Sequence, residues 1–313
     1  MRSFEPDALE CLAAIVEEGG FERAAVRLSI TQSAVSQRLR SLEAQIGTVL
    51  LVRSRPVKPT AAGRLLLKHA MQMRLLRADL DFDLQELALQ STAPREEERV
   101  SIAINADSIA TWALGALDGL LQDGLPLEII TDDQDFTHDW LREGQVLGCV
   151  TTNDRALRGC KVAPLGSMHY VAVASPQYAQ AHCPQGLSPQ NFRSIPFIAF
   201  NRKDDLQTEF VARALKLRRV SLRQRFVPSG HGQMHAVRSG WGASVLPRQL
   251  VQPWLDSGDM VELLPGFTLA VQLYWHCWNL NSDVIDRLTR ALTQGAQTAL
   301  AQDMQEKNSH NTE

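Results

Sequence analysis

The chain has 313 residues, of which 44% are hydrophobic and 21% charged, and its formal net charge is −3. This length allows two or three domains with sizeable cores, and the slightly acidic balance excludes a uniformly basic protein. The sequence holds no apolar run of about 18 residues and no basic and apolar N-terminal regions typical of a signal peptide, so no membrane association is expected.

The cysteines indicate a reducing compartment. Their number is odd, their spacing is wide, and no C-x-x-C pair occurs, which is typical of reduced, mostly buried thiols rather than of a disulfide framework. We therefore expect a cytoplasmic protein. The five are Cys11, Cys149, Cys160, Cys183 and Cys277.

The first 30 residues predict two helices in close succession. Apolar residues recur at helical spacing over 7–18, and Gly19-Gly20 ends that helix. A second, shorter helix is expected at 21–29, with Ile30-Thr31 as a tight connection to the next element. Two helices joined by so short a turn are typical of a helix-turn-helix.

A third helix is predicted at 32–46, with Thr31 as its N-cap and Gly47 as its C-terminal stop. One face of this helix is apolar and is expected to anchor it to its own domain. That stripe consists of Val35, Leu39, Leu42 and Ile46. A short strand at 49–52 and a loop or hairpin at 53–59, rich in proline and basic residues, complete a winged helix-turn-helix over residues 1–60.

The charge of this region favours a polyanionic partner. Between Arg23 and Lys68 the chain holds nine basic residues and one acidic residue, Glu43, a local balance of +8 in a slightly acidic protein. In a helix-turn-helix the second helix enters the DNA major groove. We therefore expect double-stranded DNA as the partner.

The face of helix 32–46 opposite the apolar stripe carries side chains suited to reading bases. Gln pairs with adenine, Arg with guanine, and Ser adapts to either. The candidates for base contacts are Gln32, Ser33, Ser36, Gln37 and Arg40. Arg38 points more sideways and is a candidate phosphate contact, as are Arg53, Arg55 and Lys58 in the wing.

Residues 61–90 predict a long helix after the capping residue Thr60. Leu66, Met73, Leu80 and Leu87 lie seven apart, an imperfect heptad that suits either packing on the same chain or pairing with a second copy. Its position between two domains favours dimerisation. The polar, proline-containing segment at 91–97 is the expected hinge.

From residue 99 short apolar segments alternate with helices, which predicts an α/β fold with largely parallel sheets. A final helix is expected from about Asp283 to Gln302, and a polar tail at 304–313. The strand candidates are 100–105, 127–131, 147–152, 169–175, 196–200, 243–247 and 269–276.

Several of these segments resemble LysR-type transcriptional regulators. FERAAVRLSITQSAVSQRLRSLEAQIGTVLLVRS (21–54) and PTAAG (59–63) are similar to their N-terminal domain, and the similarity continues through nearly the whole chain. NADSIATW (105–112) and LYWH (273–276) resemble the arginine/lysine-responsive, ArgP/LysG-like subgroup, which regulates export of basic amino acids. The segment VPSGHG (227–232) departs from that subgroup, because Gly and His replace part of a more polar stretch.

This resemblance implies a linker helix that pairs two subunits, a homotetramer built from two dimers, and an effector-binding domain like a periplasmic binding protein. Its two α/β lobes would be joined by crossing strands, with a ligand cleft between them. The expected effector domain is 98–303, with lobe I at 98–167 and 268–303 and lobe II at 168–267. RNA polymerase is the further partner that a transcriptional regulator implies.

The effector is expected beyond the carboxyl ends of the strands, where open α/β sheets bind ligands. A cationic amino acid needs a partner for its α-carboxylate and an acidic partner for its side chain. The free N–H groups after residue 104, together with Ser108, suit the carboxylate, and acidic residues in the loops suit the cation. The candidates are Asn105, Asp107, Ser108, Asp132, Asp133, Thr151, Thr152, Asn201, Asp204, Asp205 and Ser229.

No catalytic constellation, cofactor motif or metal-ligand set accompanies these residues, so an enzyme is not expected. The leading hypothesis is a ligand-responsive transcriptional regulator that controls basic amino acid (lysine or arginine) export or metabolism. One alternative is an architectural or replication-control DNA-binding protein with no small-molecule response. Another is a regulator that responds to a different metabolite.

Overall fold

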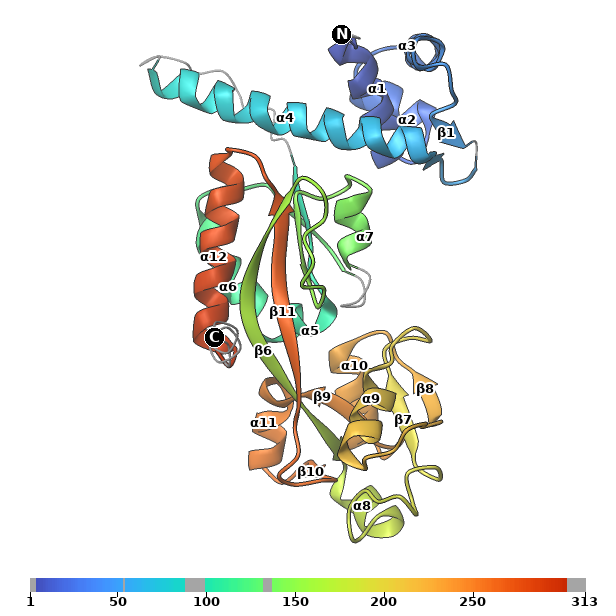
Figure 1. The fold of residues 1–313 in the computed structure, drawn as a ribbon, viewed down its shortest axis with the longest axis vertical. Coiled ribbons are helices and arrows are strands. Elements are labelled where there is room, and N and C mark those ends of the chain that lie inside the picture. The colour runs from blue at the N-terminus through green and yellow to red at the C-terminus, as the bar shows by residue number, and fades with distance from the viewer. Residues whose placement is uncertain (1–3, 53, 88–98, 132–136, 303–313) are drawn as a thin grey trace, which may run out of the picture.

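The computed structural model describes residues 4–52, 54–87, 99–131 and 137–302. Figure 1 shows a small helical domain, the long helix α4, and an elongated α/β region. The α/β region consists of two lobes, which are joined by the long strands β6 (Cys160–Ala174) and β11 (Leu269–Trp278).

The N-terminal domain forms as its caps and apolar stripes predict. Thr31 Oγ1 accepts a hydrogen bond from Ala34 N at 3.2 Å, and Gly47 ends the third helix in the left-handed region with φ 85°. The predicted helix at 32–46 is therefore confirmed to the residue. The elements are α1 (Pro6–Glu17), α2 (Phe21–Arg27), α3 (Gln32–Ile46) and the antiparallel pair β1 (Leu51–Val52) and β2 (Lys58–Pro59).

Helix α4 (Ala61–Leu87) packs against both halves of the molecule. Leu67 and Ala70 lie in the core of the N-terminal domain, whereas Leu75 is buried in the core of the α/β region. In the turn after helix α7 (Thr137–Arg142), Gly144 has φ 75°, and a Cβ atom there would lie 2.6 Å from Lys68 Cα. Only a glycine allows this turn to approach the α4 backbone so closely.

The predicted heptad on α4 is only partly available to a second subunit. Leu66 and Met73 pack against the core of the N-terminal domain. Near the other end of α4, the leucines described as exposed are Leu76, Leu80 and Leu84, spaced four residues apart, of which Leu80 belongs to the predicted heptad. This end of the helix projects beyond the N-terminal domain (Figure 1).

Lobe I has parallel strands β3, β4 and β5 at its centre, with α6 and α12 packed against each other. Strand β3 pairs with β4 on one side, in register Ile102 to Ile129, and with β5 on the other. The elements are β3 (Val100–Ala103), α5 (Ala106–Ser108), a π-helical turn (Ile109–Ala113), α6 (Leu114–Gln122), β4 (Leu127–Ile130), α7 (Thr137–Arg142), β5 (Gly148–Thr151) and α12 (Asp283–Ala299).

Lobe II places β9 and β10 against the second half of β6 and adds the parallel pair β7 and β8. Its elements are α8 (Pro176–His182), β7 (Pro196–Ala199), α9 (Leu206–Ala214), β8 (Arg223–Phe226), α10 (Gly230–Arg238), β9 (Ser244–Pro247), α11 (Arg248–Asp256) and β10 (Val261–Glu262). The polar strand β8 was not predicted, because its sequence RQRF lacks an apolar alternation.

The expectation of largely parallel sheets was wrong for the connecting sheet. In the described residues its order is β10-β6-β11-β5-β3-β4, with β9 also on β6, and every pairing of β6 and β11 is antiparallel. The reason is that β6 and β11 run through both lobes in opposite directions. Their length also exceeds the prediction, since β6 begins at Cys160 rather than at residue 169.

The core follows the strand alternation of β6. Tyr170, Ala172 and Ala174 face the large core shared with lobe I, while Val171 and Val173 face a second cluster under α10 and α11.

All five cysteines are free thiols and four of them are buried, as expected. Within the described ranges, no helix has the length and apolar character needed to cross a bilayer.

Candidate DNA-reading helix and ligand cleft

Helix α3 presents the predicted polar face to solvent. Gln32, Ser33, Gln37 and Arg40 are exposed and Ser36 is half-buried, while the opposite stripe is held in the domain core. The Arg40 guanidinium donates from Nε to the Ser36 carbonyl at 3.2 Å, which leaves its other nitrogens free to contact a ligand. The structure therefore brings the five candidate base contacts together on one surface of one rigid helix.

The candidate phosphate contacts are placed less uniformly. Arg38 is half-buried and forms an ion pair with Asp7 of α1 at 3.1 Å, so some of its charge is already compensated. Arg55 and Lys58 are exposed in the β1–β2 hairpin, which forms the wing predicted from the sequence. Arg53 lies outside the described residues.

Between the two lobes lies a small cavity. Its volume is about 30 Å³. A bound water needs roughly 10–15 Å³, so an amino acid enters only if the lobes separate. The lining residues are Asn105, Ala106 and Asp107 of lobe I and Phe200, Asp204, Leu206, Gln207, Gln233 and Val245 of lobe II.

Asp107 is the central residue of this cleft. Its Oδ2 accepts a hydrogen bond from Tyr170 Oη at 2.8 Å. Burial, with a smaller contribution from the charge of Asp204 in the other lobe, raises the pKa of Asp107 to about 6, although the Tyr170 hydrogen bond acts in the opposite direction. The cleft thus holds two carboxylates, one from each lobe.

Asp204 is fixed by backbone groups at the start of α9. Its Oδ2 accepts from Phe200 N and its Oδ1 from Leu206 N, both at 2.9 Å. These two hydrogen bonds set the position of the carboxyl group. The loop conformation therefore holds the Asp204 side chain where lobe II lines the cavity.

The turn that begins at Asn105 contains unpaired buried polar atoms. Asn105 and Ser108 are almost fully buried, yet Asn105 Oδ1 and Ser108 Oγ have no hydrogen-bond partner within the described residues. Asn105 precedes α5 without capping it by its side chain, and the helix continues through the π-helical turn. Buried polar atoms without partners are costly, and π-helical turns are frequent at functional sites. Both features point to a ligand at this helix start.

The remaining effector candidates lie elsewhere. Asn201 Oδ1 accepts from Lys203 N within its own loop, and Ser229 caps α10 by accepting from Gly232 N at 3.1 Å. Thr151 is buried at the end of β5, where its hydroxyl accepts from Asn153 N, and Thr152 is half-buried. Asp205 lines a separate groove on lobe II. Asp132 and Asp133 lie outside the described residues.

Sequence reasoning missed two glutamines of the cleft. Gln207 exchanges two hydrogen bonds with the Val245 backbone, and Gln233 bonds to Val227 O and Ser244 Oγ. Gln207 could have been predicted from the sequence, because it falls on the buried face of α9 with Leu206 and Phe210. A polar residue at an apolar helix position indicates a specific partner.

The fold and these sites together define a bipartite protein, with a helix-turn-helix for DNA and a two-lobed domain for a small ligand. Family models agree with both assignments. The model described as "Bacterial regulatory helix-turn-helix protein, lysR family" matches residues 6–64, and the "LysR substrate binding domain" model matches residues 93–297. The chain belongs to the LysR family of transcriptional regulators.

Individual relatives narrow the subgroup. The chain is 41% identical to LysG of Mycobacterium tuberculosis over 281 residues, 90% of each chain, and 39% identical to ArgP of Pseudomonas aeruginosa over 294 residues, 92% and 95% of the two chains. The crystal structure of ArgP from M. tuberculosis superimposes with a TM-score of 0.82 at 39% identity, covering 96% of this chain and 100% of that one. Full-length LysG from Corynebacterium glutamicum with bound effector Arg superimposes with a TM-score of 0.72 at 34% identity, covering 95% and 99%.

The predicted class is therefore confirmed. The protein is a LysG/ArgP-like transcriptional regulator with a DNA-binding helix-turn-helix and a LysR substrate-binding domain, and this family of regulators is not enzymatic.

Proposed function

We propose that this regulator senses a basic amino acid, lysine or arginine, in the cleft between its lobes and thereby controls a gene for export or metabolism of basic amino acids. The observation that carries the proposal is the pair Asp107 and Asp204, which line one cavity from opposite lobes. The LysG relative with bound Arg supports the same ligand class.

The charges of the cleft fit those of the ligand. A basic amino acid carries two cationic groups and one carboxylate. Asp107 and Asp204 supply two anionic partners, while the helix start with Asn105 and Ser108 supplies N–H groups and unpaired polar atoms for the carboxylate. A neutral amino acid would leave one of the two carboxylates uncompensated in a desolvated site.

The other candidate effector residues remain predictions and have less structural support than Asp107 and Asp204. Asp132 and Asp133 follow β4 and are candidates for contact when the cleft opens. Thr151, Thr152, Asn201, Asp205 and Ser229 are proposed at most as secondary contacts, because each is engaged locally or lies outside the cavity.

For the assembly, we propose pairing of α4 helices through Leu76, Leu80 and Leu84, whose exposed fractions are 44%, 55% and 51%. Two such dimers would form the homotetramer implied by the family, acting in the cytoplasm with RNA polymerase on double-stranded DNA.

The proposed domain limits are 1–60, 61–90, 91–97 and 98–303. In the DNA-binding domain, Gln32, Ser33, Ser36, Gln37 and Arg40 are proposed to read bases, and Arg38, Arg53, Arg55 and Lys58 to contact phosphates.

Operator binding tests this function. Gel-shift titrations of the full chain on its own promoter region are expected to change in midpoint or in complex mobility when saturating arginine or lysine is present. Citrulline, which has the shape of arginine without its side-chain charge, is the matched control and is expected to have no effect. If citrulline acts as arginine does, or if none of the three changes the complex or transcription from it, the proposed effector class is wrong.

A further inference from the structure

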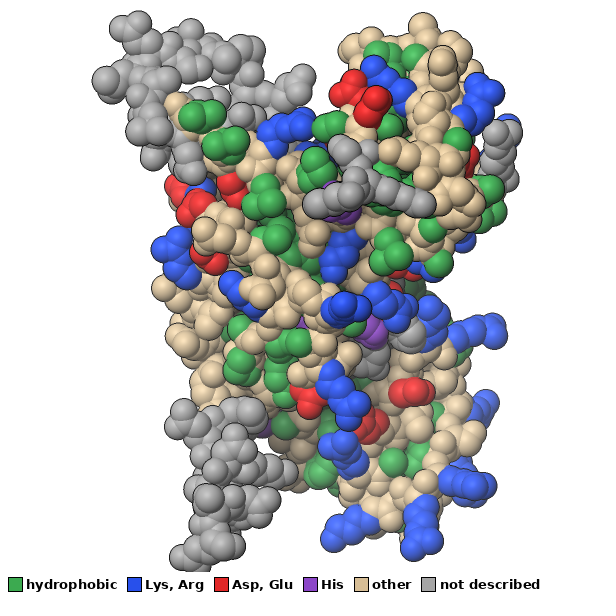
Figure 2. All heavy atoms as spheres, turned by 45° about the horizontal axis from the view of Figure 1, so that its top comes forward, with side chains coloured by type: hydrophobic (Ala, Val, Ile, Leu, Met, Phe, Trp, Pro, Cys, Tyr) green, Lys and Arg blue, Asp and Glu red, His purple; other side chains and the backbone are tan. Residues whose placement is uncertain are grey.

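Lobe II carries a concentration of positive charge far from the DNA-reading helix. Residues 193–225 hold nine basic and three acidic residues, a net charge of +6 in a chain whose total is −3. Figure 2 shows Lys and Arg side chains projecting over this region of the molecule with few acidic side chains among them. We define the arginine surface as Arg193, Lys216, Arg218, Arg219, Arg223 and Arg225, all of which are exposed.

Most of these basic side chains form no ion pair with an acidic side chain of the described chain. Arg213 of this segment pairs with Glu209 on α9, whereas the six residues of the arginine surface form no salt bridge within the described chain. Arg225 instead donates to the Trp241 carbonyl, and Arg193 lies over the Phe192 ring. Uncompensated like charges at close spacing repel one another, so a polyanionic partner would relieve them.

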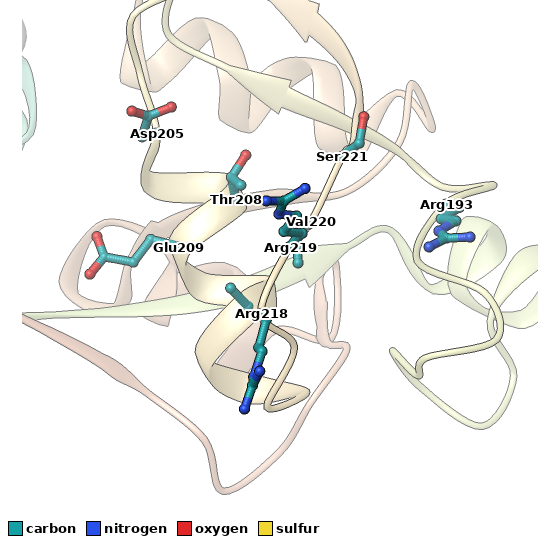
Figure 3. A pocket seen from close by; sticks show the side chains of 9 residues that line it. Arg193, Asp205, Thr208, Glu209, Arg218, Arg219, Val220 and Ser221 are labelled. Carbon is teal, nitrogen blue, oxygen red and sulfur yellow. The ribbon is translucent and has the colours of Figure 1, made fainter.

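The surface has a shape as well as a charge. A groove of about 910 Å³ runs between α9 and the segment Arg218–Ser221. In Figure 3, Arg218 and Arg219 lie beside α9 and Arg193 lies farther away on a separate loop, while the carboxylates of Asp205 and Glu209 lie on the other side of the helix. Such a groove accommodates an extended peptide segment better than it accommodates the flat surface of a folded protein.

Strand β8 continues the arginine surface and offers a free edge. Among the described strands it pairs only with β7, and Figure 1 places it on the outer side of lobe II. Arg223 and Arg225 alternate along it, so their side chains share one face. Exposed strand edges bind extended peptides by main-chain hydrogen bonds, while the alternating side chains select the sequence.

The position of the arginine surface favours a protein over DNA as its binding partner. In Figure 1 the N-terminal domain with α3 lies at one end of the long axis, and lobe II, which carries β8 on its side, lies toward the other. A straight duplex held by α3 therefore does not reach β8 of the same subunit. Seven of the nine basic residues are arginines, whose planar guanidinium pairs with a carboxylate through two hydrogen bonds.

We propose that the arginine surface docks an extended acidic segment of a partner protein along β8 and the adjoining groove. This interaction is independent of the effector cleft. It would give the regulator a protein contact at the end of the molecule that faces away from its DNA.

Fluorescence anisotropy with a labelled peptide of alternating Glu and Val, at low salt and with the full chain, tests the proposal. The test variant is Arg218→Glu/Arg223→Glu. The matched control, Arg155→Glu/Arg290→Glu, makes the same charge change at exposed positions of lobe I. Arg218→Gln/Arg223→Gln serves as a milder variant, and thermal unfolding and arginine binding verify that each variant is folded.

The expected result is peptide binding at least about tenfold weaker in the test variant and about unchanged in the control. Binding of a non-operator DNA duplex is expected to be equal in the two. Equal loss of peptide binding in both variants would overturn the proposal, because general charge would then explain it, and unchanged binding in both would do the same. Selective loss of DNA binding in the test variant would assign the surface to nucleic acid instead.

Discussion

Asp107→Asn is expected to make the protein more stable at pH 7.5 and, at the same time, to weaken its binding of arginine by about 10–100-fold. The pKa of Asp107 in the folded chain is about 6, above its ordinary value of 3.8, mainly because the carboxyl is buried. Ionisation of Asp107 therefore opposes folding, and this cost is absent below about pH 4 and complete above about pH 7. An asparagine avoids the charge and still accepts the hydrogen bond from Tyr170.

The gain in free energy of unfolding at pH 7.5 is expected to be about 1–3 kcal/mol, smaller than a fully enclosed charge would give because the side chain keeps some exposure. Urea unfolding at pH 7.5 and pH 4 measures it, and the difference from the wild type should vanish at the lower pH. Asp118→Asn, at an exposed position of α6 outside the cleft, is the control and should change neither property. A less stable Asp107→Asn variant at pH 7.5 would show that the carboxylate is structural.

Gln37→Ala and Arg40→Ala are each expected to weaken operator binding by roughly 1–3 kcal/mol while leaving binding to random DNA nearly unchanged. Both side chains are exposed on α3, and the helix itself is anchored by Val35 and Leu39. Truncation therefore removes a base contact without disturbing the domain core.

Competition gel shifts with operator and random duplexes separate the two effects. Ser41→Ala, on the exposed C-terminal half of α3, is the control and should bind as the wild type does. If Arg40→Ala loses the same affinity for both duplexes, with a smaller salt dependence, Arg40 contacts phosphate and does not read a base.

Local signals predicted the N-terminal domain accurately because its structure is local. Thr31 and Gly47 mark the ends of α3, and a period of 3.6 residues identifies its buried face. The exposed face could be assigned for the same reason, since residues on one helix share a face wherever the helix lies.

The effector cleft was predicted only partially because it is built from segments far apart in sequence. Asn105, Asp107 and Asp204 could be named as loop residues after strands, but their meeting in one cavity depends on how β6 and β11 connect the lobes. Those strands were predicted too short and mainly parallel, and Gln207 and Gln233 lie inside helices where no motif marks them. Tertiary pairing, rather than local propensity, decides these features.

The most direct test of the central claim is the number of protons released when arginine binds at pH 6. Half of Asp107 is protonated at that pH in the free protein, and a cation held beside it would lower its pKa and expel the proton. Calorimetric titration of the full chain in phosphate and in a buffer of high ionisation enthalpy measures this number, because the difference in heat divided by the difference in ionisation enthalpy gives the protons released. About half a proton per site is expected for the wild type, and none for Asp107→Asn. Equal heats in both buffers, or equally tight binding of citrulline, would contradict a cleft that recognises the ligand by its positive charge.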